Sequence, residues 1–356
     1  MRSLPERVDI GGIVAEYSID VDSTSLIRLR SLKGSTNVFK VDRSDLIEEL
    51  YIVDTIQGKG IACHPHIVGQ RLSAFAFDAA LEAAKAIEQL TDLSSVDQDC
   101  VVVENVLRAA PGYEIHSAFR ELNRGKSFRD VWIRPRYETP SYRSHDEEAS
   151  RCLSVVYEDF DALPHNREIV VLKPDTEATG RTAQKSIEGI ISKCENVGST
   201  IEKIILYGFI SVPGLKTIRE TAKKNGIELA AFAIGNVTAL AHNGYDMTLY
   251  GVDESFWEAT RQIKKLGSIV DATTLKRYLP EFVPGSDQPG DWSNRQTSIY
   301  VTREKKEPGR IEQHLQNSIQ LIQRLTGISD YSPWQEEIAD NELRLLHTAL
   351  EEHSAC

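Results

Sequence analysis

The sequence predicts an α/β protein built on a parallel sheet. Between about residues 100 and 275, short apolar runs rich in β-branched residues alternate with stretches whose apolar side chains have helical spacing. Near-continuous apolar runs are typical of strands buried on both faces, and strands that alternate with helices usually pair in parallel. Ligands of such sheets bind beside the carboxyl ends of the strands. We therefore expect the functional residues in the loops that follow the strands.

The predicted strands of this core share an apolar, β-branched character. They are residues 100–107, 130–133, 152–157, 168–172, 203–210 and 228–234. The clearest helices between and after them cover residues 180–195, 214–225 and 255–267. We divide the chain into a mixed α/β N-terminal extension (1–95), this core (96–275), and a linker with a helical C-terminal extension (276–356).

Both extensions contain recognisable patterns. In the first, residues 67–92 have helical spacing, residues 12–21 and 26–32 have the composition of strands, and residues 44–56 predict a helix capped by Ser44. In the second, an apolar stripe at steps of three and four predicts a helix, and a further helix follows. The residues of the stripe are Ile311, Leu315, Ile319, Ile322 and Leu325.

Composition excludes several classes of protein. The chain has 356 residues, of which 41% are hydrophobic and 26% are charged, as in an ordinary globular protein. A net charge of −12 opposes binding to nucleic-acid phosphates. No apolar run has the length of a membrane span, and the first residues lack the apolar segment of a secretory signal. We therefore expect a cytoplasmic protein without nucleic-acid or membrane partners.

The five cysteines are scattered without CxxC pairs, so we expect reduced thiols. Cys63, His64 and His66 nevertheless fall within four residues of one another, which raises the question of a metal site. Pro65 separates the two histidines, and the sequence shows no second cluster of ligands. An ordinary loop is therefore the favoured interpretation of this segment.

Residues 170–187, VVLKPDTEATGRTAQKSI, form a candidate phosphate site where a strand leads into a helix. The unpaired amides of a first helical turn and the positive end of the helix dipole favour an anion. Gly180 permits close approach of the backbone, Thr179 and Thr182 carry hydroxyl donors, and Asp175 can accept hydrogen bonds from sugar hydroxyls. The alternative is a plain strand-to-helix joint with a threonine cap. Neither GxxxxGK[ST] nor GxGxxG is present.

The stretch resembles the signature of type I phosphoribosyltransferases, in which a buried strand leads into two acidic residues and then Thr-Gly-x-Thr. Asp175 matches the second acidic position, whereas Pro174 stands where the first acid usually is. The resemblance implies that Asp175 binds the ribose and that the following residues bind its 5-phosphate. These residues are Ala178, Thr179, Gly180, Arg181 and Thr182.

Two segments upstream resemble the uracil-specific branch of that family. Residues 106–122 resemble its pyrophosphate loop, with Leu107, Arg108 and Ala109 matching and Ala110 in place of glycine. Residues 133–142 resemble its mobile segment, which is carried here by Arg134, Glu138, Thr139 and Pro140. The resemblance implies that pyrophosphate is bound by Arg108, Ala109, Arg134 and Arg136, with Arg143 as a further candidate.

Two segments downstream continue the resemblance in the same order. Residues 210–218 are similar to a strand end and helix start of the family. Residues 240–255 resemble its base-binding segment but lack the Pro-Gly step, and a residue separates Gly251 from Asp253. The resemblance implies that the acceptor is bound by Asn243, Gly244, Tyr245 and Asp253. It covers residues 100–255 only.

The resemblance implies a transferase that moves a phosphoribosyl group from phosphoribosyl pyrophosphate to a nitrogen of uracil or another heterocycle. We expect Mg²⁺ as cofactor, bound through pyrophosphate, with Asp253 as a candidate protein ligand and Glu177 as a residue that could assist the metal. We also expect a homodimer. Two alternatives stay open: a non-catalytic regulator that binds a phosphoribosyl ligand, and a different phosphate-handling α/β enzyme such as a sugar-phosphate isomerase or lyase.

Overall fold

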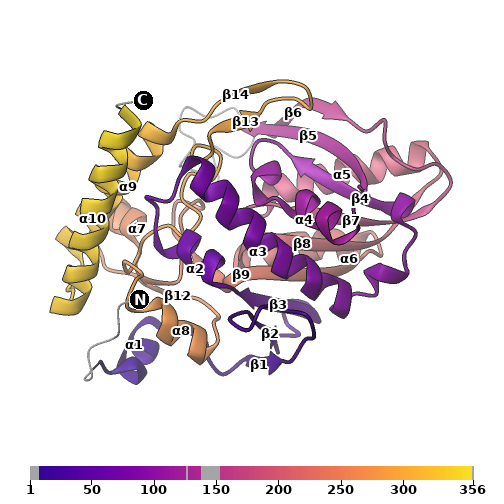
Figure 1. Cartoon of the computed structure of the whole chain (residues 1–356). Helices are drawn as coiled ribbons and strands as arrows, with labels where there is room; N and C mark the ends of the chain where they lie inside the picture. The colour runs from indigo at the N-terminus through magenta and orange to yellow at the C-terminus, as the bar shows by residue number, and fades with distance from the viewer. Residues whose placement is uncertain (1–7, 126, 138–152, 355–356) are drawn as a thin grey trace.

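The computed structural model describes residues 8–125, 127–137 and 153–354. A ten-stranded sheet crosses the molecule in the order β1-β2-β3-β9-β8-β7-β4-β5-β6 (Figure 1), and β10 pairs with the C-terminal end of β9. The strands are β1 (Thr24–Ile27), β2 (Asn37–Val41), β3 (Glu49–Asp54), β4 (Val101–Val106), β5 (Arg129–Tyr137), β6 (Leu153–Asp159), β7 (Glu168–Pro174), β8 (Thr200–Ser211), β9 (Glu228–Leu240) and β10 (Met247–Thr248).

The middle of the sheet is parallel, as the sequence predicts. Strands β3, β9, β8, β7, β4 and β5 all pair in parallel with their neighbours in that order. The predicted parallel pairing is wrong for residues 152–157, because the strand there, β6, runs antiparallel to β5 as the second arm of a hairpin. Strands β1, β2 and β10 are also antiparallel to their neighbours.

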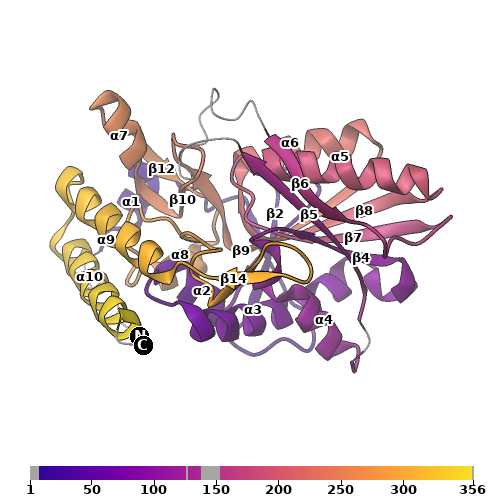
Figure 2. The same ribbon diagram turned by 90° about the horizontal axis from the view of Figure 1, so that it is seen from above.

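Helices cover both faces of the sheet (Figure 2). Because alternate residues of a strand point to opposite faces, Val101 and Val103 pack with α3 and α4, whereas Val102 packs with α5 and α6. The helices of these two layers are α2 (Ile56–Cys63), α3 (Gly69–Leu90), α4 (Ile115–Leu122), α5 (Arg181–Asn196) and α6 (Val212–Lys224). The predicted helices at 67–92, 180–195 and 214–225 are therefore confirmed.

The N-terminal extension is part of the same sheet, and two predictions there are wrong. Residues 44–56 were expected to form a helix, but they contain β3, which pairs with β9 and is buried along most of its length. Residues 12–21 were expected to form a strand, but they overlap α1 (Ile10–Tyr17), which Asp9 caps by accepting a hydrogen bond from the amide of Gly12. Pairing and capping outweigh intrinsic propensity in both segments.

The C-terminal region lies beside the sheet and includes a pair of long helices. Helices α9 (Ile311–Ile328) and α10 (Pro333–Ser354) lie side by side, and the predicted apolar stripe of α9 is buried against α10 (Figure 1). The predicted helix at 255–267 is shorter than expected. The smaller elements are α7 (Glu254–Thr260), α8 (Ala272–Tyr278), β11 (Tyr250–Val252), β12 (Lys265–Gly267), β13 (Ser298–Tyr300) and β14 (Lys306–Pro308).

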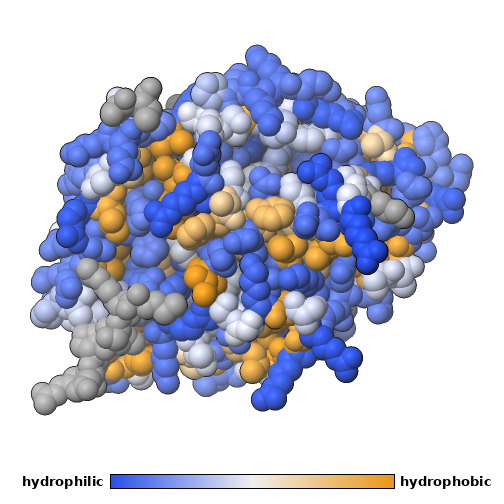
Figure 3. All heavy atoms as spheres, in the orientation of Figure 1, coloured by the Kyte–Doolittle hydropathy of each residue, from blue (hydrophilic) through white to orange (hydrophobic). Residues whose placement is uncertain are grey.

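Hydrophilic residues predominate on the face drawn in Figure 3, with apolar residues scattered among them. Among the helices that the structure describes, none is long and apolar enough to cross a bilayer.

Candidate functional site

The predicted phosphate and pyrophosphate loops lie next to each other. Strand β4 is paired in parallel with β7 on one side and with β5 on the other, so their carboxyl ends reach the same edge of the sheet. The loop after β7 contains Asp175 to Gly180, and the loop after β4 begins at Leu107. The sheet therefore brings together two segments that are about seventy residues apart in the chain.

The loop after β7 presents free backbone amides. Glu177 still pairs with β8, since its amide donates to Phe209 and its carbonyl accepts from Ser211. Gly180 then adopts a left-handed conformation with φ of 73°, and α5 starts directly after it without a side-chain cap. Within the described residues, the amides of Thr179, Gly180 and Thr182 donate no hydrogen bond. Such a turn is suited to an anion.

The close packing of this loop against α6 explains the glycines. A Cβ on Gly180 would lie 2.5 Å from the carbonyl oxygen of Gly214, and one on Gly214 would lie 2.3 Å from the carbonyl oxygen of Glu177. The hydroxyl of Ser211 caps α6 and also donates to the carbonyl of Ala178. The loop is therefore held by backbone contacts, and these contacts are possible only because Gly180 and Gly214 have no side chain.

Asp175 lies in a buried cluster of charges. Its carboxylate accepts a hydrogen bond from the amide of Thr176 and pairs with the ammonium group of Lys173 at 3.3 Å. Lys173 is completely buried and also contacts Glu177 at 3.0 Å and Glu104 at 4.0 Å. Burial raises the pKa of Asp175 and of Glu104 to about 7 in each case. The ribose-binding role of Asp175 stays a prediction, and in this structure its carboxylate is bonded to its own loop and to Lys173.

The loop after β4 carries a cation without a carboxylate partner. The peptide bond that precedes Arg108 is cis, and Arg108 forms no hydrogen bond or ion pair within the described ranges. Burial lowers the pKa of Arg108, and the nearby guanidinium groups of Arg134 and Arg310 lower it further, against a smaller opposing effect of Glu307. Mutual repulsion of arginines costs free energy unless an anion is bound between them. An arrangement of this kind is suited to an anion.

Two of these cations come from segments outside the loop. Arg134 lies on β5 and donates to the carbonyl of Val301, so it links the sheet to the C-terminal region. Burial lowers the pKa of Arg134, and the positive charge of Arg136, an exposed residue on the same strand, lowers it further. Arg310 directly precedes α9. The predicted pyrophosphate residues Arg108, Arg134 and Arg136 thus lie together, with Ala109 half-buried beside Arg108.

Aromatic side chains connect the two loops with the C-terminal region. The hydroxyl groups of Tyr113 and Thr176 are 2.5 Å apart, so the loops after β4 and β7 are hydrogen-bonded to each other. The ring of Tyr113 stacks on Trp292, with ring centroids 4.2 Å apart. Tyr113 thus contacts both the loop after β7 and the C-terminal region.

Three of the four predicted acceptor residues, Asn243, Gly244 and Tyr245, lie in the turn after β9. The side chain of Asn243 accepts from the amides of Tyr245 and Asp246, which makes it part of the turn itself. Tyr245 donates to Asp291 and lies close enough to raise the pKa of Arg108 slightly. Gly244 is buried in the turn. The turn therefore approaches the arginine cluster.

Asp253 has a structural role that the sequence did not indicate. It caps α7, and its two carboxylate oxygens accept from Ser255, Phe256 and the amide of His242 and pair with Lys264. It is 1% exposed. Since both of its oxygens are occupied, this arrangement does not favour Asp253 as a metal ligand or an acceptor contact.

A polar cavity of about 390 Å³ lies beside the loop after β4. Asn105 and Pro174, near the ends of β4 and β7, form part of its wall, and residues of α4, β5, β13, β14 and the loop after β4 form most of the rest. The side-chain nitrogen of Asn105 is buried without a hydrogen-bond partner among the described residues. The cavity offers space for a small polar molecule close to both loops.

Sequence patterns did not indicate Arg310, Tyr113, Trp292 or the charges around Lys173. The only signal for the last was a charged residue inside an apolar run, as in VVVENV and VVLKP. Of the predicted positions in the mobile segment, Glu138, Thr139, Pro140 and Arg143 lie outside the described residues.

Comparisons with known proteins give weak matches. No protein-family model matches the chain, and no curated protein matches its sequence. Among solved structures, adenine phosphoribosyl transferase from Trypanosoma brucei in complex with AMP, pyrophosphate and ribose-5-phosphate has 14% sequence identity and a TM-score of 0.28, over 46% of this chain and 68% of that chain. Orotate phosphoribosyltransferase from Francisella tularensis has 12% identity and a TM-score of 0.28, over 76% and 96%. A TM-score this low does not establish a shared fold.

Proposed function

We propose that this protein binds phosphoribosyl pyrophosphate with Mg²⁺ and transfers the phosphoribosyl group to a nitrogen of uracil or another heterocycle, with release of pyrophosphate. One observation carries the proposal. The free amides around Gly180 and the unpaired guanidinium group of Arg108 lie on neighbouring loops at one edge of the sheet. A ligand with a phosphate at one end and a pyrophosphate at the other matches two such sites.

The chemistry requires positioning more than proton transfer. The bond between the anomeric carbon and pyrophosphate breaks as positive charge develops on the ribose ring. Arg108, Arg134 and Arg310 would bind the anionic leaving group, and the amides from Ala178 to Thr182 would hold the 5-phosphate. Mg²⁺ would be bound by the pyrophosphate oxygens, where it neutralises part of their charge.

The acceptor would bind between the turn at residues 243–245 and the loop after β4. Tyr245 approaches Arg108 from that turn, so an acceptor there would face the same anion site. The cavity lined by Asn105 is the other place for a heterocycle, because its unpartnered amide can pair with a ring nitrogen or carbonyl.

A second candidate function is a non-catalytic sensor of the same ligand. Pro174 stands at the first acidic position of the signature, and the carboxylate of Asp175 is bonded to Lys173 and the amide of Thr176. Fewer groups would then steady the ribose in the transition state. Such a protein would bind the donor without turning it over.

Calorimetric titration with phosphoribosyl pyrophosphate and Mg²⁺ tests the binding half of the proposal. The wild-type protein is expected to bind, and Arg108→Ala is expected to weaken binding about 10- to 100-fold, because it removes a charge-assisted contact to an anion. Arg28→Ala, an exposed arginine beside the far edge strand β1, is the matched control and is expected to bind like the wild type.

Pyrophosphate release across a panel of nucleobases separates the two functions. An enzyme releases pyrophosphate with at least one acceptor, whereas a sensor binds the donor and releases none. Absence of any heat with the wild type, or equal affinity of the Arg108 and Arg28 variants, would contradict donor binding at this site.

A further inference from the structure

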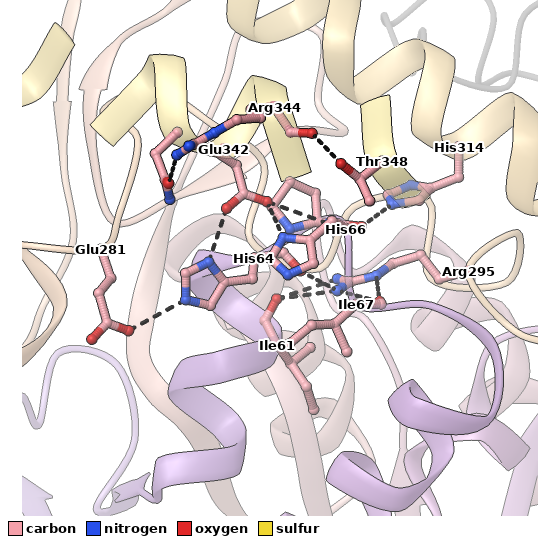
Figure 4. A network of polar contacts seen from close by, with 12 residues as sticks. Ile61, His64, His66, Ile67, Glu281, Arg295, His314, Glu342, Arg344 and Thr348 are labelled. Carbon is pink, nitrogen blue, oxygen red and sulfur yellow. Dashed lines mark hydrogen bonds and ion pairs between the residues drawn. The ribbon is translucent and has the colours of Figure 1, made fainter. Parts of the chain in front are cut away.

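The histidines of the segment after α2 converge on one carboxylate from the C-terminal helix. Nδ1 of His64 lies 2.9 Å from one oxygen of Glu342, and Nδ1 of His66 lies 2.6 Å from the other (Figure 4). The three ligand atoms all lie within 4.8 Å of one another. The sequence could not indicate this group, because Glu342 is separated from His66 by 276 positions.

The far side of His64 has the partner that a metal-bound imidazole needs. Its Nε2 lies 3.3 Å from Glu281, which in turn pairs with Lys59 at 2.9 Å. A carboxylate on the second ring nitrogen fixes the orientation and the tautomer of a ligating histidine, which leaves Nδ1 free to bind a cation. The pairing of His64 with Glu281 therefore prepares Nδ1 for the position beside Glu342.

The backbone of the segment is held rigidly. Arg295 is completely buried, and its guanidinium group donates to the carbonyls of Ile61, His64 and Ile67 (Figure 4). His314 contacts the carbonyl of Pro65 at 2.8 Å through Nε2. Metal ligands bind tightly when their supporting contacts fix them before the ion arrives. These contacts come from two other parts of the chain, Arg295 and His314 of α9, and hold the segment in place.

We propose that His64, His66 and Glu342 bind a divalent cation of the zinc type, which fastens α10 to the segment after α2. Two imidazole nitrogens with one carboxylate oxygen suit Zn²⁺ and disfavour Mg²⁺ and Ca²⁺, which prefer oxygen ligands. Three protein ligands leave one position for water. Cys63 is fully buried and is not a member of the group.

The site requires only a small change in geometry. Ligand atoms about 2.0–2.1 Å from a tetrahedral ion lie somewhat more than 3 Å apart. The present separations of 2.9 and 2.6 Å would therefore grow by about 0.4 and 0.7 Å, and the two imidazole nitrogens, which lie within 4.8 Å of each other, would have to reach a similar separation. The side chain of His66 is 11% exposed, whereas that of Glu342 is 2% exposed, so His66 is the more accessible of the two to solvent.

Titration of the full-length protein with ZnCl₂ after removal of metal with a chelator tests the proposal. One Zn²⁺ is expected to bind per chain, the unfolding midpoint is expected to rise with Zn²⁺, and MgCl₂ is expected to leave it unchanged. The comparison of the wild type with and without Zn²⁺ needs no variant and so does not depend on the folding of one.

The variants separate a metal site from a metal-free contact. His66→Ala is expected to weaken Zn²⁺ binding at least about 100-fold, and Glu281→Gln about 10- to 100-fold, since it replaces the carboxylate that pairs with His64 by a neutral amide. His347→Ala changes an exposed histidine of α10 and is expected to bind like the wild type. The outcome that overturns the proposal is a wild type that binds no more Zn²⁺ than His66→Ala and shows the same unfolding midpoint with and without Zn²⁺. In that case the group would be a histidine–carboxylate contact only.

Discussion

Replacing Gly180 with alanine is expected to reduce the affinity for phosphoribosyl pyrophosphate at least about 100-fold, because several charge-assisted contacts to one phosphate are lost together. The new Cβ would lie 2.5 Å from the carbonyl oxygen of Gly214 and 2.9 Å from Cβ of Thr217, so the turn must move away from α6. Such a shift displaces the free amides that face the anion. Calorimetric titration with the donor and Mg²⁺ measures the loss.

Gly226→Ala is the matched control for this substitution. Gly226 also has a positive φ, of 68°, and ends a helix, but a Cβ there would meet nothing within 4 Å. Both variants carry the conformational cost of alanine in the left-handed region, about 1 kcal/mol. Only Gly180→Ala adds the clash in the phosphate loop. Equal donor affinity of the two variants would show that the loop does not bind the phosphate.

The buried charges around Lys173 are expected to make the protein less stable as the pH rises from about 5 to 8. Burial raises the pKa of Glu104 and of Asp175 to about 7, above the ordinary values of 4.5 and 3.8. The folded state therefore binds these protons more tightly than the unfolded chain. Their contribution to the free energy of unfolding is full below about pH 4 and is lost as the pH rises through about 7. Denaturant unfolding at a series of pH values measures this slope.

Glu104→Gln is expected to flatten that slope and to raise the free energy of unfolding at pH 8 by about 1 kcal/mol. The amide removes one negative charge while Lys173 keeps the closer carboxylates of Asp175 and Glu177. Glu202→Gln, an exposed position on β8, is the control and is expected to change neither quantity. A steeper slope in Glu104→Gln would mean that Glu104 is ionised and needed as a partner of Lys173.

The parallel core could be predicted because its strands are buried on both faces and consist of apolar, β-branched residues. The same reasoning predicted α9 from the spacing of Ile311 and Leu315. It was wrong for β3, where Ser44 and two glutamates favour a helix locally. Pairing with β9 buries Leu50 and Ile52 completely, and a local pattern contains no information about a partner strand that begins at Glu228.

From the sequence we could predict that one core strand leads into a Thr-Gly turn before a helix and that an arginine follows closely after another core strand. These are local features, because they depend on residues a few positions apart. The residues that join them in space could not be predicted in this way, because they are brought there by the tertiary fold. Arg310 lies near Arg108, and Glu342 lies between His64 and His66, because parallel pairing and helix packing bring distant segments to the same place. The distances between these residues are set by how the chain folds, and they cannot be inferred from the spacing of the residues in the sequence.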